Sequence, residues 1–146
     1  MRSNISDIYS LIQDLSWYFG NQGFDGRCCE DISLVEYVAL KKVCETKEMS
    51  IQEIATELNV TKGGVSKIID RLEEKQYVFR EKSSSDGRVC CVIPTEKGVN
   101  AARKISDRYT DYLKEVLNSV EDDSIVNIRS VLELLLRLVR DKGYIK

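Results

Sequence analysis

Two short amphipathic helices separated by a tight turn are the feature of this sequence that most restricts its fold. The first lies at residues 50–59, where Ser50 and Glu53 have the spacing of a capping box and Asn59 stands where a helix should end. The second lies within residues 60–72, where apolar side chains recur at helical spacing, so that one face is expected to be buried. Two short helices in this order are the helix-turn-helix pattern. The apolar positions of the second helix are Val65, Ile68, Ile69 and Leu72.

The polar faces of the second helix carry short hydrogen-bonding and cationic side chains, which suit a helix that lies in the DNA major groove. The helix also contains Gly63 and Gly64, although each glycine costs roughly 1 kcal/mol relative to alanine. A close approach of the helix to DNA would explain glycine here, and so would packing that tolerates a flexible first turn. The residues that we expect to contact bases or phosphates are Thr61, Lys62, Gly63, Ser66, Lys67 and Arg71.

A β-hairpin is predicted directly after this helix. Residues 77–82 and 88–93 favour strands, and residues 83–87 supply turn chemistry. Such a hairpin is a wing, and its tip can reach the minor groove, where a narrow groove attracts arginine. We therefore expect Arg88 to enter the minor groove. We also expect Asp86 to support the wing and to be available as a partner for Arg71.

The helix and the hairpin together resemble the MarR family (multiple antibiotic resistance regulators) of winged helix-turn-helix transcription regulators. The resemblance covers nearly the whole chain and implies a mainly α fold with a small β-hairpin wing. It also implies a DNA-binding repressor that binds a pseudo-palindromic operator as a homodimer and is released by a small-molecule or stress signal. The motifs that carry the resemblance are Asp70-Arg71-Leu72-Glu73, Tyr77-Val78-Phe79-Arg80, Asp86-Gly87-Arg88 and Thr95-Glu96-Lys97-Gly98.

Two positions depart from the family pattern. Gln76 stands where the family usually has glycine, so the exit from the second helix is expected to differ. Pro94 replaces the usual apolar residue before Thr95 and is expected to end the second strand of the wing early. Thr95 itself is expected to cap a new helix.

The remaining segments are predicted as helices on either side of this region. Residues 5–19 carry an amphipathic stripe, and Ser33 with Glu36 has the spacing of a second capping box. After the wing, a long helix is expected from Thr95 to about residue 118. The last helix follows the acidic residues 121–123 and is apolar over more than one face. A partner that covers the second face would explain this, and a position between two neighbours of its own chain is the alternative.

We therefore expect a homodimer, because two-fold symmetry is how such proteins bind two half-sites. The expected organisation is a single winged-helix domain over residues 1–146. Within it, residues 34–98 would form the DNA-binding lobe, and residues 1–22 and 99–146 would form the dimerisation helices.

Charge and composition restrict the function further. The net charge is −2, and residues 50–97 hold eight basic and eight acidic residues, so tight non-specific DNA binding is not indicated and a protein-interaction module of the same fold stays an alternative. The chain has no histidine and no Gly-rich phosphate loop, so neither an enzyme, a cofactor nor a metal site is expected. No run of about 18 apolar residues and no signal peptide is present, which predicts a cytoplasmic protein with no membrane partner.

Five cysteines are the unusual part of the composition. In the cytoplasm they are expected to be reduced, and small buried apolar side chains are the simplest interpretation. On a strand, neighbouring cysteines point to opposite faces, so one of Cys90 and Cys91 should be buried and the other accessible. A regulator that senses oxidants or soft metals through cysteine is the alternative. Its candidate residues are Cys28, Cys29, Cys90 and Cys91.

The resemblance also implies an effector pocket between the dimer helices and the DNA-binding lobe. The aromatic residues expected in that region are Trp17, Phe24, Tyr37 and Tyr109, all of which suit a hydrophobic core equally well.

Overall fold

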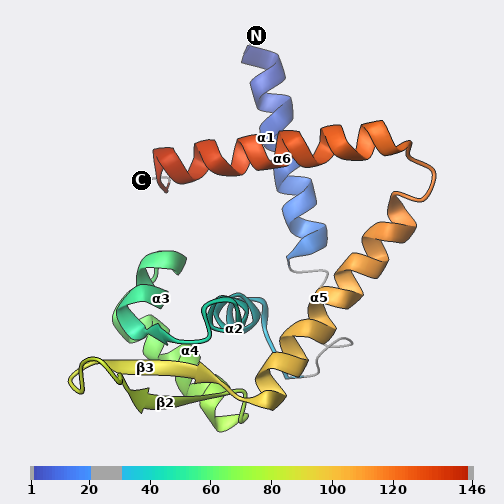
Figure 1. The fold of residues 1–146 in the computed structure, drawn as a ribbon. Coiled ribbons are helices and arrows are strands. Elements are labelled where there is room, and N and C mark those ends of the chain that lie inside the picture. Colours follow the sequence, from blue (N-terminus) through green and yellow to red (C-terminus); the bar gives the residue numbers. More distant parts are fainter. Residues whose placement is uncertain (1, 21–30, 145–146) are drawn as a thin grey trace. The chain divides into compact units, whose positions relative to one another are not determined.

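The computed structural model describes residues 2–20 and 31–144, and Figure 1 shows its helices and strands in chain order. The chain divides into two compact units, residues 1–105 and 106–146, with the boundary inside α5. The elements are α1 (Arg2–Phe19), α2 (Leu34–Thr46), β1 (Met49–Ser50), α3 (Ile51–Leu58), α4 (Lys62–Glu74), β2 (Val78–Lys82), β3 (Cys90–Pro94), α5 (Glu96–Val116) and α6 (Asp122–Lys142).

The three strands form one antiparallel sheet in the order β1-β3-β2, and the loop between β2 and β3 is the free outer end of the hairpin (Figure 1). The predicted wing is therefore present. The sequence did not predict β1, because a strand of two residues has no hydrophobic period. The strand ends at the proline as expected, but Pro94 is itself the last residue of β3 and pairs with Val78, one residue beyond the predicted bound. The missing N–H of Pro94 is tolerated because β1 pairs only with Cys91 and Val92.

The core of the first unit is built from one face each of α2, α3 and α4, from the start of α5 and from the inner face of the sheet. All four apolar positions predicted on the second helix are buried in α4. The start of α5 completes the core through Ala102 and Ile105. The largest fully buried side chains are Leu40 of α2, Ile54 of α3, Ile69 and Leu72 of α4, Val92 of β3 and Ile105 of α5.

The end of α4 has the geometry for which glycine is usually chosen, although Gln76 occupies the position. Gln76 has a φ of 67°, in the left-handed region. Its N–H donates to the carbonyl of Glu73 at 2.9 Å, and the N–H of Tyr77 donates to the carbonyl of Leu72 at 2.9 Å. This pair of hydrogen bonds is a Schellman motif. The C-terminal end of α4 therefore differs from the family pattern in residue type, whereas its backbone has the conformation for which glycine is usual.

Replacing Gln76 with glycine is expected to raise the free energy of unfolding by about 1 kcal/mol, because the left-handed conformation strains a residue with a Cβ. Urea denaturation of both proteins measures the difference. An unchanged or lower free energy of unfolding would mean that interactions of the Gln76 side chain stabilise the protein at least as much as its left-handed backbone destabilises it.

The wing joins α5 through a close backbone contact. Thr95 accepts the N–H of Gly98 at 3.0 Å through its hydroxyl oxygen and donates that hydroxyl to the carbonyl of Gln76 at 2.7 Å. The predicted cap at Thr95 is thus confirmed. A Cβ at Gly98 would lie 2.0 Å from the carbonyl oxygen of Tyr77, so this position requires glycine.

The second unit contains the C-terminal part of α5 and all of α6. Asp122 and Asp123 lie in the first turn of α6, where the helix dipole favours acidic groups. No residue of α6 is buried, and its exposed apolar side chains include Val131, Leu134 and Leu138. Among the helices that the structure describes, none is long and apolar enough to cross a membrane.

Candidate nucleic-acid interface

The first turns of α4 carry exposed cationic side chains. Thr61 is the N-cap of the helix, and its hydroxyl oxygen accepts the N–H of Gly64 at 3.0 Å. Lys62 and Lys67 are exposed, and neither forms an ion pair with a residue in the ranges 2–20 and 31–144. Ser66 is half-buried on the same part of the helix. Five of the six DNA contacts predicted for this helix therefore lie at its N-terminal end, namely Thr61, Lys62, Gly63, Ser66 and Lys67.

The two glycines of α4 have different surroundings. A Cβ at Gly64 would lie 2.7 Å from Cγ1 of Val60 and 3.2 Å from Oγ1 of Thr61, so local crowding accounts for this glycine. A Cβ at Gly63 would meet no atom within 4 Å. Packing inside the protein therefore does not explain Gly63, and a close approach to DNA stays the prediction for it.

Changing Gly63 to alanine is expected to weaken DNA binding about tenfold while raising the free energy of unfolding by up to about 1 kcal/mol. The opposite signs arise because the added methyl group favours the helix but occupies space that DNA would need. Urea denaturation and fluorescence anisotropy with labelled DNA measure the two quantities. An affinity equal to that of the wild type would leave only the packing interpretation.

The C-terminal half of α4 is tied to α2 through a buried carboxylate. Glu36 accepts a hydrogen bond from Nε of Arg71 at 3.1 Å through one oxygen and from Nζ of Lys75 at 2.8 Å through the other. Its side chain is 5 % exposed. Ser33 caps α2 as predicted, but the side chain of Glu36 holds α4 instead of closing the expected capping box.

This arrangement changes the role expected for Arg71. Its ion pair is with Glu36 and not with Asp86, so the expected bond to the wing is wrong. The side chain of Arg71 is 49 % exposed, and contact with a phosphate stays a prediction for it. The sequence reasoning missed Glu36 because a pairing across 35 residues leaves no local pattern.

The wing is joined to α4 through Arg80 of β2. The guanidinium donates to Oδ1 of Asp70 at 2.6 Å, to Oε1 of Glu73 at 2.7 Å and to the carbonyl of Ser66 at 3.3 Å. The backbone N–H of Arg80 also donates to Oε2 of Glu73 at 3.0 Å. The sequence reasoning missed this cluster, although two acids three residues apart on a helix, followed by a strand arginine, could have indicated it.

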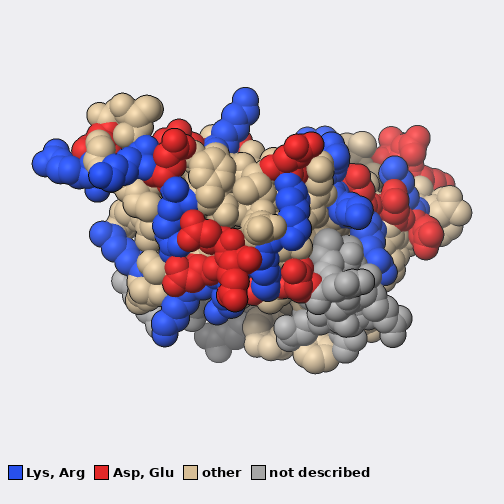
Figure 2. Space-filling view, turned by 90° about the horizontal axis from the view of Figure 1, so that it is seen from below, with Lys and Arg blue, Asp and Glu red and all other residues tan. Residues whose placement is uncertain are grey.

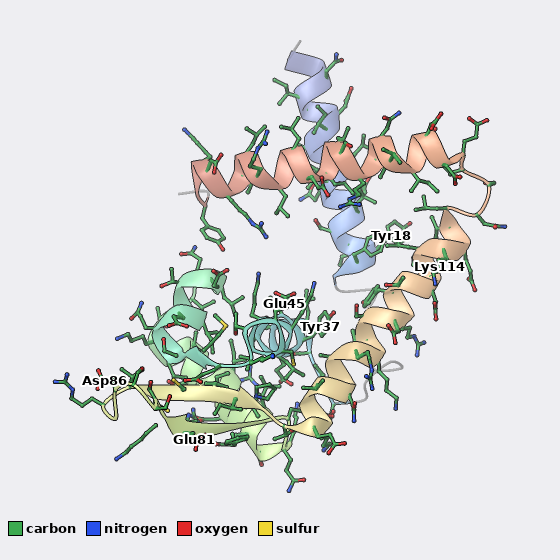
Figure 3. All side chains as sticks on the ribbon, viewed as in Figure 1. Tyr18, Tyr37, Glu45, Glu81, Asp86 and Lys114 are labelled. Carbon is green, nitrogen blue, oxygen red and sulfur yellow. The ribbon has the colours of Figure 1, made fainter. Side chains whose placement is uncertain are left out.

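The tip of the wing presents Arg88 to solvent. Figure 3 shows Asp86 at the outer end of the hairpin, beyond Glu81 of β2. Oδ1 of Asp86 accepts the backbone N–H of Arg88 at 3.0 Å and its Nε at 3.3 Å. The side chain of Arg88 is 93 % exposed. Asp86 therefore contacts Arg88 in the way that a wing support would.

Ion pairs take up both acidic and basic side chains of the first unit. Asp70 and Glu73 are bonded to Arg80, and Glu36 is bonded within the protein as well. The face drawn in Figure 2 accordingly shows acidic side chains among basic ones. An open groove of about 780 Å³ lies between the start of α3 and the wing, and both Lys62 and Arg88 line it.

The cysteines that the structure describes are placed as small side chains of a core and a strand. Cys91 is buried and Cys90 is exposed, so the prediction that the two point to opposite faces is confirmed. Burial raises the pKa of the Cys91 thiol, and the carboxylate of Glu48 raises it further. Burial also raises the pKa of Cys44. Cys28 and Cys29 lie outside the described residues.

The candidate effector residues lie on three different helices. Trp17 is on α1 and is 52 % exposed, Tyr37 is half-buried on α2, and Tyr109 is half-buried on α5 in the second unit. Phe24 lies outside the described residues. A shared pocket for these aromatic side chains stays a prediction.

Comparison with known proteins identifies this arrangement. Residues 32–90 match the model of the MarR family. The part of the chain from α2 to the start of β3 is therefore similar to the MarR family. The chain is 24% identical over 103 residues to the HTH-type transcriptional regulator MhqR of Bacillus subtilis. The aligned region covers 70% of this chain and 69% of MhqR. MhqR is an HTH-type transcriptional regulator, which agrees with the expectation that this chain is not an enzyme.

Two solved structures share the fold of this chain. A MarR family protein from Bacillus stearothermophilus superposes with a TM-score of 0.84 at 19% identity, over 94% of this chain and 96% of that protein. FabT of Streptococcus pneumoniae, solved in complex with DNA, superposes with a TM-score of 0.79 at 21% identity, over 98% of this chain and 100% of FabT.

Proposed function

We propose that this chain is a transcriptional repressor that binds a pseudo-palindromic DNA operator as a homodimer. The observation that carries the proposal is the pairing of two exposed cationic elements in one unit. Lys62 and Lys67 at the start of α4 form no ion pair among the described residues, and Arg88 stands almost fully exposed at the wing tip. A helix for the major groove and an arginine for the minor groove are what a winged helix needs to read DNA.

The apolar surface of the second unit supports the dimer. A groove of about 340 Å³ between the end of α5 and the side of α6 is lined mainly by leucine and isoleucine. Further along α6, Val131 is 63% exposed and Leu138 is 52% exposed. Helices with this much exposed apolar surface are typical of an interface, and a second copy would double the number of DNA half-sites.

Repression and its release by a signal rest on the family. The solved FabT complex shows that a protein of this fold binds DNA. A dimer that covers its operator blocks other proteins from that DNA. A small molecule or a stress signal that favours another arrangement of the two DNA-binding units would then lower the affinity for the operator.

Gel shifts with fragments of the source genome, in excess non-specific competitor DNA, test the proposal. We expect the wild-type protein to retain a small number of fragments, and the Arg88→Ala variant to retain them weakly. If the folded wild-type protein retained none, a winged helix that binds other proteins would replace the repressor.

A further inference from the structure

The side chain of Arg80 joins the two elements that are proposed to contact DNA. It is 26 % exposed and bonds Asp70 and Glu73, which lie on the same side of α4 because they are three residues apart. It also reaches the carbonyl of Ser66, in the part of α4 that carries the candidate DNA contacts. One arginine thus holds two carboxylates and a backbone carbonyl of the recognition helix.

Because of the position of Arg80 in the wing, these bonds affect the direction of the whole hairpin. It is the central residue of β2 and lies opposite Val92 of β3, so its side chain fixes the direction in which the hairpin leaves α4. Beyond this point, Arg88 bonds only to Asp86 within the described part of the chain. The reach of Arg88 therefore depends on how the base of the wing is held.

We propose that Arg80, Asp70 and Glu73 form a clamp that positions the wing relative to α4, so that Arg88 and the lysines of α4 engage DNA together. This inference rests on the DNA binding proposed above. Arg80 acts here as a positioning residue, because a guanidinium bonded to two carboxylates is a rigid planar link that a lysine cannot reproduce.

The double variant D70N/E73Q separates positioning from simple charge. It removes two negative charges from the helix that faces DNA, so electrostatics alone predicts tighter binding. Loss of the clamp predicts the opposite sign, with binding about tenfold weaker because Arg88 is no longer held in place. E74Q is the matched control, since Glu74 is an exposed acid of the same helix with no ion pair among the described residues. It should bind as tightly as the wild type or slightly more tightly.

The experiment measures affinity by fluorescence anisotropy for a labelled duplex that the wild type selects from random DNA. Circular dichroism establishes that each variant is folded at the assay temperature. The affinity of each protein is also measured after Arg88→Ala is added to it. If Arg80 only stabilised the fold, loss of its partners would lower the melting temperature, but Arg88→Ala would cost the same affinity in every background. We expect Arg88→Ala to cost much less affinity in D70N/E73Q than in the wild type. If D70N/E73Q does not fold, R80K replaces it. The affinity of R80K is then measured with and without Arg88→Ala, and we expect the same loss of the Arg88 effect.

Two results would overturn the inference. One is a folded D70N/E73Q that binds as tightly as the wild type, or more tightly. The other is an effect of Arg88→Ala that is equal in both backgrounds. Either result leaves the proposed function standing, whereas a wild-type protein that selects no duplex overturns the function and the clamp together.

Discussion

The double variant V131E/L138E is expected to be a monomer that binds operator DNA at least about a hundredfold more weakly than the wild type. Both side chains are more than half exposed on α6, at 63% for Val131 and 52% for Leu138. Seven residues apart, they share one face of the helix. Two carboxylates on that face would be desolvated and opposed to their own copies in a two-fold interface, which disfavours association.

Sedimentation velocity at micromolar concentration measures the change in mass, and anisotropy measures the change in affinity. Ser130→Glu is the control, because it adds a charge to an exposed polar position of the same helix. It should remain a dimer. A wild-type protein that sediments as a monomer, or a folded dimer formed by V131E/L138E, would contradict the proposed interface.

The triple variant K62A/K67A/R88A is expected to lose sequence-specific DNA binding while keeping the melting temperature of the wild type. All three side chains are exposed, so their removal leaves no buried group without a partner. Each lysine that contacts a phosphate releases about one counterion, so Lys62→Ala and Lys67→Ala should each lower the salt dependence by about one unit per subunit.

Affinity measured between low and moderate salt gives these slopes for each variant. Lys82→Ala is the control, since Lys82 is an exposed cation of β2 that forms no ion pair with a described residue. It removes the same charge from the wing without touching the proposed contacts. If the triple variant bound like the wild type, or if Lys82→Ala weakened binding as much, the assignment of these residues would be wrong.

Local patterns predicted the fold well because they act within one helix or one hairpin. The capping box at Ser50 and Glu53 is present, and Asn59 ends α3 in the left-handed conformation. The strand of two residues, β1, was not predictable because it is defined only by its pairing with β3.

The candidate site was predictable in part for the same reason. Helical spacing separated the buried face of α4 from Lys62 and Lys67, and the turn sequence placed Arg88 at the wing tip. The partners of Glu36 and Arg80 come from distant segments, and no local pattern fixes such pairs. The charge count over residues 50–97 indicated a neutral region, but it could not show which charged side chains pair with one another, as Asp70 and Glu73 do with Arg80.

Selection of bound sequences from random DNA tests the central claim most directly, namely that two copies of the α4 and wing surface read DNA. The account predicts one enriched motif made of two inverted half-sites, with centres about 10 base pairs apart or a multiple of that spacing. It also predicts that the K62A/K67A/R88A variant enriches no motif. Enrichment of a single half-site would contradict the dimer, and a wild-type protein that enriches no sequence would contradict DNA recognition itself.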